Sequence, residues 1–478
     1  MKSSVRNLSA FAVAMLITGS VDSVRNLPAT ALFGSQLFFF AIFSALVFLI
    51  PTGLLAAQLA SNAQLPTGIY GWVRTAFGKR IGLLAVWLQW INTLIWYPTI
   101  LSFIAGTIAY LISPVLAQNK YYLITIILST FWIMTLINLR GLKASTRFAS
   151  TCAVVGMVVP MGLIIFLGLT WLAFNRPLQI SFQWQDLWPS FTHGNSWISL
   201  TAIMTAFLGM ELAAVHVKDV HNPQKTFPRA LFFSVIFILF TMIAGALSIA
   251  IVLPAHQIQL VSGVMQAFQY FFAAYHLEIL TVPLVIMLVL GSVGSLVNWI
   301  ISPTKGLLHA GEEGFLPPWL CTKNKHNVPS VLLIGQAILV TLICVAFLIM
   351  PSVNGSYWFL TALSTQLYML MYVLMFLAAI QLEKDPRIVH STFRIPGKRI
   401  GTTIAASAGL VGSLTTVVVG FFPPDGIDVG PVWQYELSFA IGMCLMAIPA
   451  LGFWWYQRKR GTHLTAITTQ DSETVALY

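Results

Sequence analysis

Long runs of apolar residues, separated by short polar connections, are the dominant pattern along the chain. A helix needs about 20 mostly apolar residues to cross the hydrocarbon core of a bilayer. The pattern therefore predicts an all-α polytopic membrane protein with about twelve transmembrane helices. The predicted spans are 8–31, 34–60, 82–112, 121–138, 150–174, 196–216, 229–253, 277–302, 330–350, 356–381, 401–421 and 434–456.

The basic residues test this number of spans, because cytoplasmic connections of membrane proteins are enriched in Lys and Arg. If the N-terminus is cytoplasmic, the alternate connections on that side hold 22 of the 25 Lys and Arg residues. Lys120 and Arg176 fall on the other side, and Arg25 lies within a span. A missed or additional span would destroy this alternation. We therefore expect both termini in the cytoplasm.

Composition supports a bilayer as the surrounding medium. Hydrophobic residues make up 58% of the chain and charged residues only 8%, whereas a soluble domain carries roughly 25% charged residues. The net charge of +11 does not indicate nucleic-acid binding, because the basic residues form short separate clusters between apolar runs. The four cysteines lack metal-type spacing, and we expect no metal, no cofactor and no disulfide framework.

The first span contains an unusual polar stretch from Gly19 to Pro28. Gly and Pro weaken a helix, and Asp22 and Arg25 would each cost about 2.5–3.5 kcal/mol or more against lipid. One interpretation is an internal Asp22–Arg25 pair, since residues three apart share a helix face. The other is a broken helix that lines a polar cavity. The two are compatible if the pair forms in the empty state and opens on binding.

The sixth span repeats this feature with Gly209 and Glu211. No basic residue lies within one helical turn of Glu211. A carboxyl group buried without a cationic partner favours its neutral form. Glu211 is therefore either a proton-coupling or gating group, which we favour, or a neutral hydrogen-bond donor that holds the core together.

Spans one and six each begin a set of five. Two five-helix repeats of opposite topology, with broken helices in corresponding positions, are a known plan of secondary transporters. Half-helix N-termini suit a carboxylate and half-helix C-termini suit an ammonium, so an amino acid is the leading substrate class. The predicted division is one transmembrane domain over 1–460, with repeats at 8–175 and 196–381 and two additional helices at 401–456, followed by a short cytoplasmic tail over 461–478.

Several motifs in the same order carry a family resemblance that extends from about residue 8 to residue 456. The chain resembles the amino acid–polyamine–organocation superfamily, and within it the bacterial glutamate:GABA antiporter group. The strongest match is the sixth span and its exit, from Gly209 to Pro223. The further motifs are Pro66–Val73 with Phe77-Gly78, which looks like the family's loop between spans two and three, Ser248–Pro254, Ser262–Gln266 and Thr392–Gly397.

This resemblance implies alternating-access exchange of an amino acid for a related amino acid or its decarboxylation product, in a bacterial inner membrane. It further implies that the first-span break and Phe207–Glu211 hold the substrate backbone. Trp299 matches an aromatic gate of the family, and Tyr368 and Tyr372 match positions facing the pathway; ordinary packing is the alternative for all three. The predicted substrate-binding residues are Gly19, Ser20, Asp22, Ser23, Arg25, Asn26, Phe207, Gly209, Met210, Trp299, Tyr97, Tyr368 and Tyr372.

Two departures from the glutamate:GABA group leave the substrate open. Only eighteen residues follow Arg460, so gating by a long C-terminal plug is not expected. Asp22 and Arg25 also differ from that group. A free Arg25 would favour a substrate with a side-chain carboxylate, and an Arg25 neutralised by Asp22 would favour a neutral amino acid.

Trp96-Tyr97-Pro98, midway along the third span, is a further candidate for the site because of its polar tip and helix-kinking proline.

Other classes of function are weighed against exchange. Proton-coupled symport is the main alternative, and a channel or a transport-like receptor is another. A membrane-embedded enzyme is disfavoured because the nine histidines are scattered without a ligand set. The expected partners are an amino acid, the lipid bilayer and protons, with no nucleic acid. We expect a monomer or a homodimer.

Overall fold

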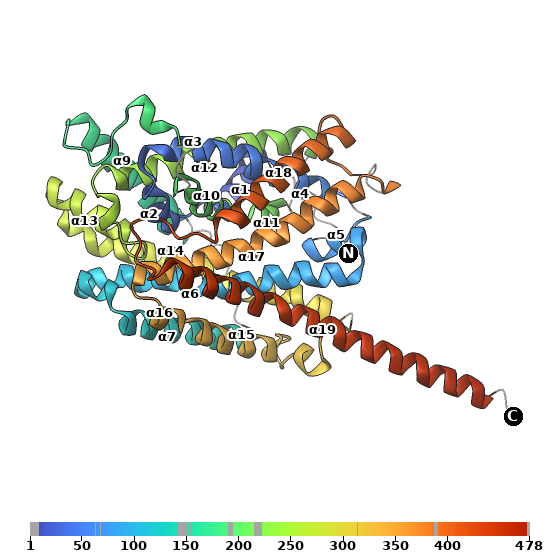
Figure 1. Ribbon diagram of the computed structural model, residues 1–478. Helices are drawn as coiled ribbons and strands as arrows, with labels where there is room; N and C mark the ends of the chain where they lie inside the picture. The colour runs from blue at the N-terminus through green and yellow to red at the C-terminus, as the bar shows by residue number, and fades with distance from the viewer. Residues whose placement is uncertain are drawn as a thin grey trace.

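The computed structural model describes residues 9–62, 64–66, 68–141, 152, 154–189, 195–214, 222–312, 314–386 and 391–475. Within these ranges the chain is built from helices and contains no β-strand, which confirms the predicted all-α fold class (Figure 1). The α-helices are α1 (Ala10–Val21), α2 (Leu27–Ala31), α3 (Leu37–Ser44), α4 (Ile50–Ala60), α5 (Ile69–Phe77), α6 (Lys79–Ile112), α7 (Lys120–Leu139), α9 (Val159–Ala173), α10 (Asn195–Ala206), α11 (Met210–Ala214), α12 (Pro223–Ala250), α13 (Gly263–Tyr275), α14 (Thr281–Glu312), α15 (Ser330–Ile343), α16 (Ala346–Ile349), α17 (Val353–Leu382), α18 (Arg399–Val419) and α19 (Val432–Val475).

In the described part of the chain, nine helices are long and apolar enough to cross a membrane. The predicted first, sixth and eighth spans are not in this set. The first and sixth are interrupted, and α14 provides only a shorter apolar helix over Glu278–Gly294. The total of twelve spans and the five-plus-five repeat therefore stay predictions.

Several boundaries differ from the sequence prediction. The expected loop Pro66–Val73 contains the start of α5, and α13 follows Ser262, where no helix was predicted. The eighth span was expected to end at 302, but α14 continues to Glu312. Helix α19 likewise runs through the predicted tail to Val475. Hydropathy indicates where a helix leaves lipid, and the backbone hydrogen bonds can continue beyond that point.

Helices α6 and α17 form the centre of the protein. They pack against each other (Figure 1), and 72% of the most apolar stretch of each is buried. Helix α19 lies at the periphery, with only 11% of its apolar stretch buried. Large side chains such as Phe232, Phe233 and Phe240 on α12 face outward. An exposed apolar surface of this extent is suited to lipid.

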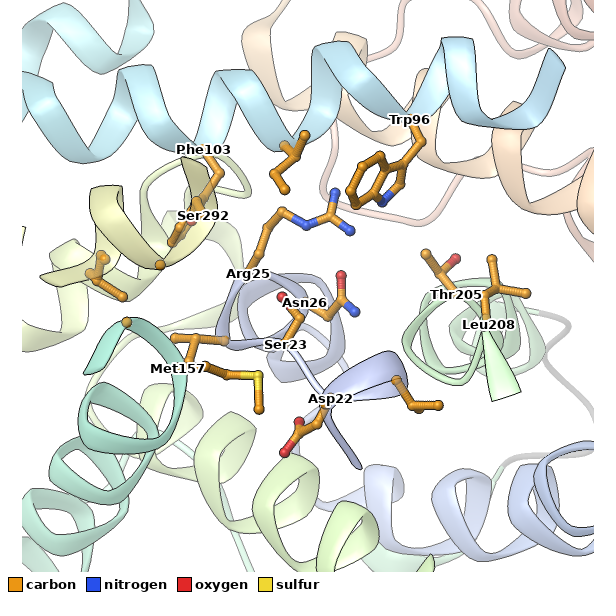
Figure 2. A pocket seen from close by; sticks show the side chains of 18 of the residues that line it. Asp22, Ser23, Arg25, Asn26, Trp96, Phe103, Met157, Thr205, Leu208 and Ser292 are labelled. Carbon is orange, nitrogen blue, oxygen red and sulfur yellow. The ribbon is translucent and has the colours of Figure 1, made fainter. Parts of the chain in front are cut away.

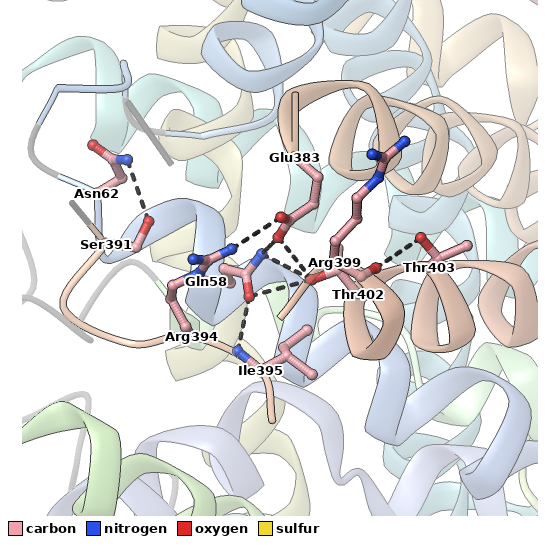
Figure 3. Close-up of polar contacts among 9 residues, drawn as sticks. All are labelled: Gln58, Asn62, Glu383, Ser391, Arg394, Ile395, Arg399, Thr402 and Thr403. Carbon is pink, nitrogen blue, oxygen red and sulfur yellow. Dashed lines mark hydrogen bonds and ion pairs between the residues drawn. The ribbon is translucent and has the colours of Figure 1, made fainter. Parts of the chain in front are cut away.

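A polar cluster, called here the Gln58 cluster, joins one end of four segments (Figure 3). Glu383, which follows α17, accepts hydrogen bonds from Gln58 of α4 (2.7 Å) and from Thr402 of α18 (2.8 Å). Arg394 donates to the same carboxylate over 3.0 Å, and the Ile395 N–H donates to Gln58 over 2.8 Å. These bonds hold the connection between α17 and α18 against the end of α4.

The contribution of this cluster to stability can be measured with adjacent threonines. Thr402→Val removes a buried donor to Glu383 and should lower the free energy of unfolding by about 1–3 kcal/mol. The neighbouring Thr403 is exposed and bonds only its own helix, at the carbonyl of Arg399. Thr403→Val should therefore change it by less than about 0.5 kcal/mol. Thermal unfolding in detergent compares the two, and equal losses would contradict a stabilising role for the cluster.

Candidate functional site

The first interrupted helix results from residues that cannot continue α1. Helix α1 ends at Val21, and Ser23 has an extended backbone (φ −157°, ψ 127°). A 3-10 turn, Val24–Asn26, then leads into α2, where Pro28 occupies a first-turn position that needs no N–H donor. The predicted break in the first span is thus present. The break leaves the backbone N–H and C=O groups at the end of α1 and the start of α2 in the interior of the protein.

The second interruption separates α10 from α11. Phe207, Leu208 and Gly209 form a turn, and Gly209 has φ +100°, a conformation that favours glycine. The peptide N–H of Gly209 donates to the Tyr372 hydroxyl over 3.1 Å. The expected break in the sixth span is therefore present as well. The exit of this span over 215–221, part of the strongest family motif, lies outside the described residues.

The two interruptions meet at a cavity of about 150 Å³ (Figure 2). Its wall combines the first-span break with residues of α6, α10, α14 and the π-helical turn Val154–Val158. An apolar cavity of about this volume accommodates benzene in another protein, so the space suits a molecule of a few heavy atoms. The lining residues are Gly19, Val21, Asp22, Ser23, Val24, Arg25, Asn26, Asn92, Thr93, Trp96, Ile100, Phe103, Gly156, Met157, Thr205, Leu208, Gly209, Leu288, Gly291, Ser292 and Tyr368.

Asp22 and Arg25 point in opposite directions (Figure 2). Asp22 accepts a hydrogen bond from Thr241 of α12 over 2.8 Å, and Arg25 donates to Thr99 of α6 over 2.7 Å. No ion pair joins Asp22 to Arg25 in this structure, so the predicted internal pair is wrong for this conformation. The i,i+3 rule applies within a continuous helix, and the extended backbone at Ser23 turns the two side chains apart.

Glu211 lies behind the cavity wall and is 2% exposed. The hydroxyls of Tyr368 and Tyr372 on α17 both donate short hydrogen bonds to it, one to each carboxylate oxygen. Tyr368 also lines the cavity. A change at Glu211 would therefore reach the cavity through the Tyr368 side chain.

The predicted site residues fall into three groups. Those that line the cavity are Gly19, Asp22, Ser23, Arg25, Asn26, Gly209 and Tyr368. Those buried elsewhere in the core are Phe207, Met210, Tyr97, Tyr372 and Glu211, which do not line it. The side chains of Ser20 and Trp299 lie outside the described part of the structure. Tyr97 instead packs against Phe131, with ring centroids 4.9 Å apart, and its neighbour Trp96 takes the position in the wall.

One face of α6 and a pair of glycines were not among the predicted site residues, although the Trp96-Tyr97-Pro98 motif included Trp96. Asn92, Trp96, Ile100 and Phe103 recur every three or four residues, which places them on one side of that helix. A polar Asn92-Thr93 pair in the middle of an apolar span was the available signal. Gly156 and Gly291 gave no such signal, because small residues are common in membrane helices for packing reasons.

The all-helical fold and an internal cavity between interrupted helices define a multi-pass membrane transporter. A crystal structure of an Eremococcus coleocola manganese transporter shares this fold, with a TM-score of 0.57 at 14% identity over 94% of this chain and 93% of that one. The chain belongs to the amino acid permease family, whose model matches residues 8–454. The predicted membership of the amino acid–polyamine–organocation superfamily is thereby confirmed, and the protein is a transporter and not an enzyme.

Three bacterial relatives show how far the similarity extends. An uncharacterized transporter of Legionella pneumophila is 37% identical over 97% of this chain and 99% of its own length. A glutamate/gamma-aminobutyrate antiporter of Lactococcus lactis is 28% identical over 95% of this chain and 92% of its own length. A probable agmatine/putrescine antiporter of the same species is 23% identical over 83% of this chain and 84% of its own length.

Proposed function

We propose that this protein is an amino acid antiporter of a bacterial inner membrane, which exchanges one amino acid for a related amino acid or a decarboxylation product by alternating access. The observation that carries the proposal is the cavity between the two interrupted helices, with Asp22 and Arg25 directed away from each other in its wall. The backbone of an amino acid carries one charge of each sign, and this wall offers a partner for each. Antiporters among the relatives support exchange as the mode of transport.

Two structural features suit alternating access around this cavity. The wall contains helices from both halves of the chain, and two of them are interrupted at the cavity itself. Interrupted helices supply backbone donors and acceptors without lipid exposure. A rocking motion between the halves would open the cavity to one side of the membrane at a time. The basic residues would place both termini in the cytoplasm.

Counterflow in proteoliposomes tests this function. Vesicles loaded with an unlabelled amino acid should take up the external labelled amino acid, and vesicles loaded with buffer alone should not. The panel of test compounds covers the twenty amino acids and their decarboxylation products, and liposomes without protein are the control. Exchange supported by an internal substrate is the expected result.

Proton-coupled symport is the alternative, favoured by the buried Glu211 next to the cavity wall. A symporter would accumulate substrate in vesicles without internal substrate once an inward proton gradient is imposed. Uptake of that kind, with no stimulation by internal substrate, would replace antiport with symport. Absence of flux for every compound of the panel would reject both modes for amino acids.

A further inference from the structure

Arg25 is a buried cation without an anionic partner among the described residues. Its side chain lines the cavity, yet the residue is only 7% exposed. The guanidinium lies 5.1 Å from the centroid of the Trp96 ring, and one terminal nitrogen donates to Thr99. No carboxylate of the described residues forms an ion pair with it. Burying a charge in this way costs several kcal/mol unless an opposite charge compensates it.

The unused donors of Arg25 have a defined geometry. The Nε atom is buried and has no hydrogen-bond partner, and Nη1 carries the bond to Thr99. The remaining edge, formed by Nε and Nη2, can donate two parallel hydrogen bonds. This is the edge with which arginine binds a carboxylate in the bidentate mode. Trp96 and Thr99 hold the plane of the guanidinium in place from α6.

We infer that Arg25 is a specificity-determining residue that binds a carboxylate of the transported substrate. The inference rests on the proposed function and adds to it the group that recognises the substrate's negative charge. The substrate carboxylate replaces the missing anion and satisfies the Nε and Nη2 donors. Asp22 lies on the other side of the break, lines the cavity and accepts from Thr241 through Oδ2, and its carboxylate would receive the substrate ammonium.

The carboxylate that Arg25 binds has two possible positions in the substrate. It is either the α-carboxylate, which all amino acids share, or a side-chain carboxylate, which only acidic amino acids have. Three probes of similar length separate these positions. Glutamate has both carboxylates, glutamine lacks the side-chain charge, and 4-aminobutyrate lacks the α-carboxylate. Aspartate, asparagine and β-alanine form the same series with one carbon fewer.

The experiment measures the affinity of these probes for wild type and for Arg25→Gln, by ligand-induced thermal stabilisation in detergent and by competition in counterflow. Loss of a charge-assisted hydrogen-bonded contact should weaken binding roughly 10- to 100-fold. If Arg25 binds the side-chain carboxylate, glutamate and 4-aminobutyrate weaken and glutamine does not. If it binds the α-carboxylate, glutamate and glutamine weaken and 4-aminobutyrate does not. Either pattern supports the inference.

Other patterns overturn the inference. Equal affinities in wild type and Arg25→Gln, or equal losses for all three probes, would make Arg25 a packing residue. Failure of both series to bind wild type would also overturn it. If wild type exchanges amino acids while these patterns appear, the proposed function survives and only the role of Arg25 fails. Absence of exchange by wild type would instead reject the proposed function.

Two further variants keep the test informative if Arg25→Gln does not fold. Arg25→Lys retains the positive charge and loses the bidentate edge, so the order of probe affinities should persist with weaker binding. Thr99→Val removes the hydrogen bond that orients the guanidinium and should weaken the same probes, less strongly. Thr107→Val is the matched control, since Thr107, like Thr99, donates to a carbonyl of α6 but does not line the cavity. If Arg25→Lys and Thr99→Val leave every affinity at the wild-type value, the inference is wrong.

Discussion

Gly156→Ala should prevent the protein from reaching its native packing. A Cβ atom at position 156 would lie 2.2 Å from the Cα of Gly291 and 2.6 Å from the carbonyl oxygen of Met287. Both contacts are with the backbone of α14, which cannot move aside as a side chain can. The two helical segments would have to separate, and overpacking costs about 1–3 kcal/mol and occasionally more.

The effect should extend to transport, because Gly156 and Gly291 both line the cavity. Gly291→Ala gives the reciprocal test, since its Cβ would lie 2.4 Å from the Cα of Gly156. We expect a large loss of folded, monodisperse protein and of counterflow for both variants. Size-exclusion chromatography with thermal unfolding measures the first, and proteoliposome uptake the second.

Gly162→Ala is the matched control in the following helix, α9. A Cβ there meets no atom within 4 Å, and alanine favours a helix over glycine by about 1 kcal/mol. This variant should be as stable as wild type or more so. If Gly156→Ala behaves like Gly162→Ala, the close approach of the two backbones is not required for folding.

Glu211→Gln should flatten the pH dependence of transport. The Glu211 carboxylate accepts from Tyr368 and Tyr372 at the same time. Protonation would turn one of its oxygens into a donor, so one tyrosine hydroxyl would lose its acceptor. Tyr368 lines the cavity, and a change in its hydrogen bonding would reach the substrate. Glutamine has no proton to release, and transport should then vary less between acidic and neutral pH.

The same substitution should also lower stability. A glutamine side chain has one acceptor oxygen and an amide that only donates. The Tyr372 hydroxyl already accepts from the N–H of Gly209. At least one buried hydroxyl hydrogen would remain without an acceptor, at a cost of about 1–3 kcal/mol. Thermal unfolding and pH-dependent counterflow measure the two effects separately.

Glu278→Gln provides the control for the loss of a carboxylate, because Glu278 is exposed and does not line the cavity. It should leave the pH profile unchanged. Tyr368→Phe removes one donor to Glu211 and should shift the profile without abolishing it. A wild-type pH profile in Glu211→Gln would exclude a coupling role and leave Glu211 as a structural acceptor for two tyrosines.

Much of the architecture could be read from local patterns. The apolar runs predicted the helices because spanning a bilayer requires a minimum length of apolar helix. Glycine, proline and charged residues predicted both interruptions, because each disfavours a continuous helix in lipid. The collinear motifs predicted the family that the comparisons confirm. These features depend on neighbours in the sequence, and the sequence by itself determines them.

The composition of the cavity wall was decided only by tertiary structure. In a soluble helix the apolar face indicates the core, but lipid is as apolar as a protein interior, so hydropathy does not say which face of a membrane helix points inward. For this reason the sequence could not show that Trp96, and not Tyr97, faces the cavity. The partners of Glu211 lie 157 and 161 residues further along the chain, and the contact between Gly156 and Gly291 also joins segments that are far apart in the sequence. Asp22 and Arg25 are close in sequence, yet the extended backbone between them and their separate partners, Thr241 and Thr99, turn them apart. This separation leaves Arg25 without an anion in the described part of the chain.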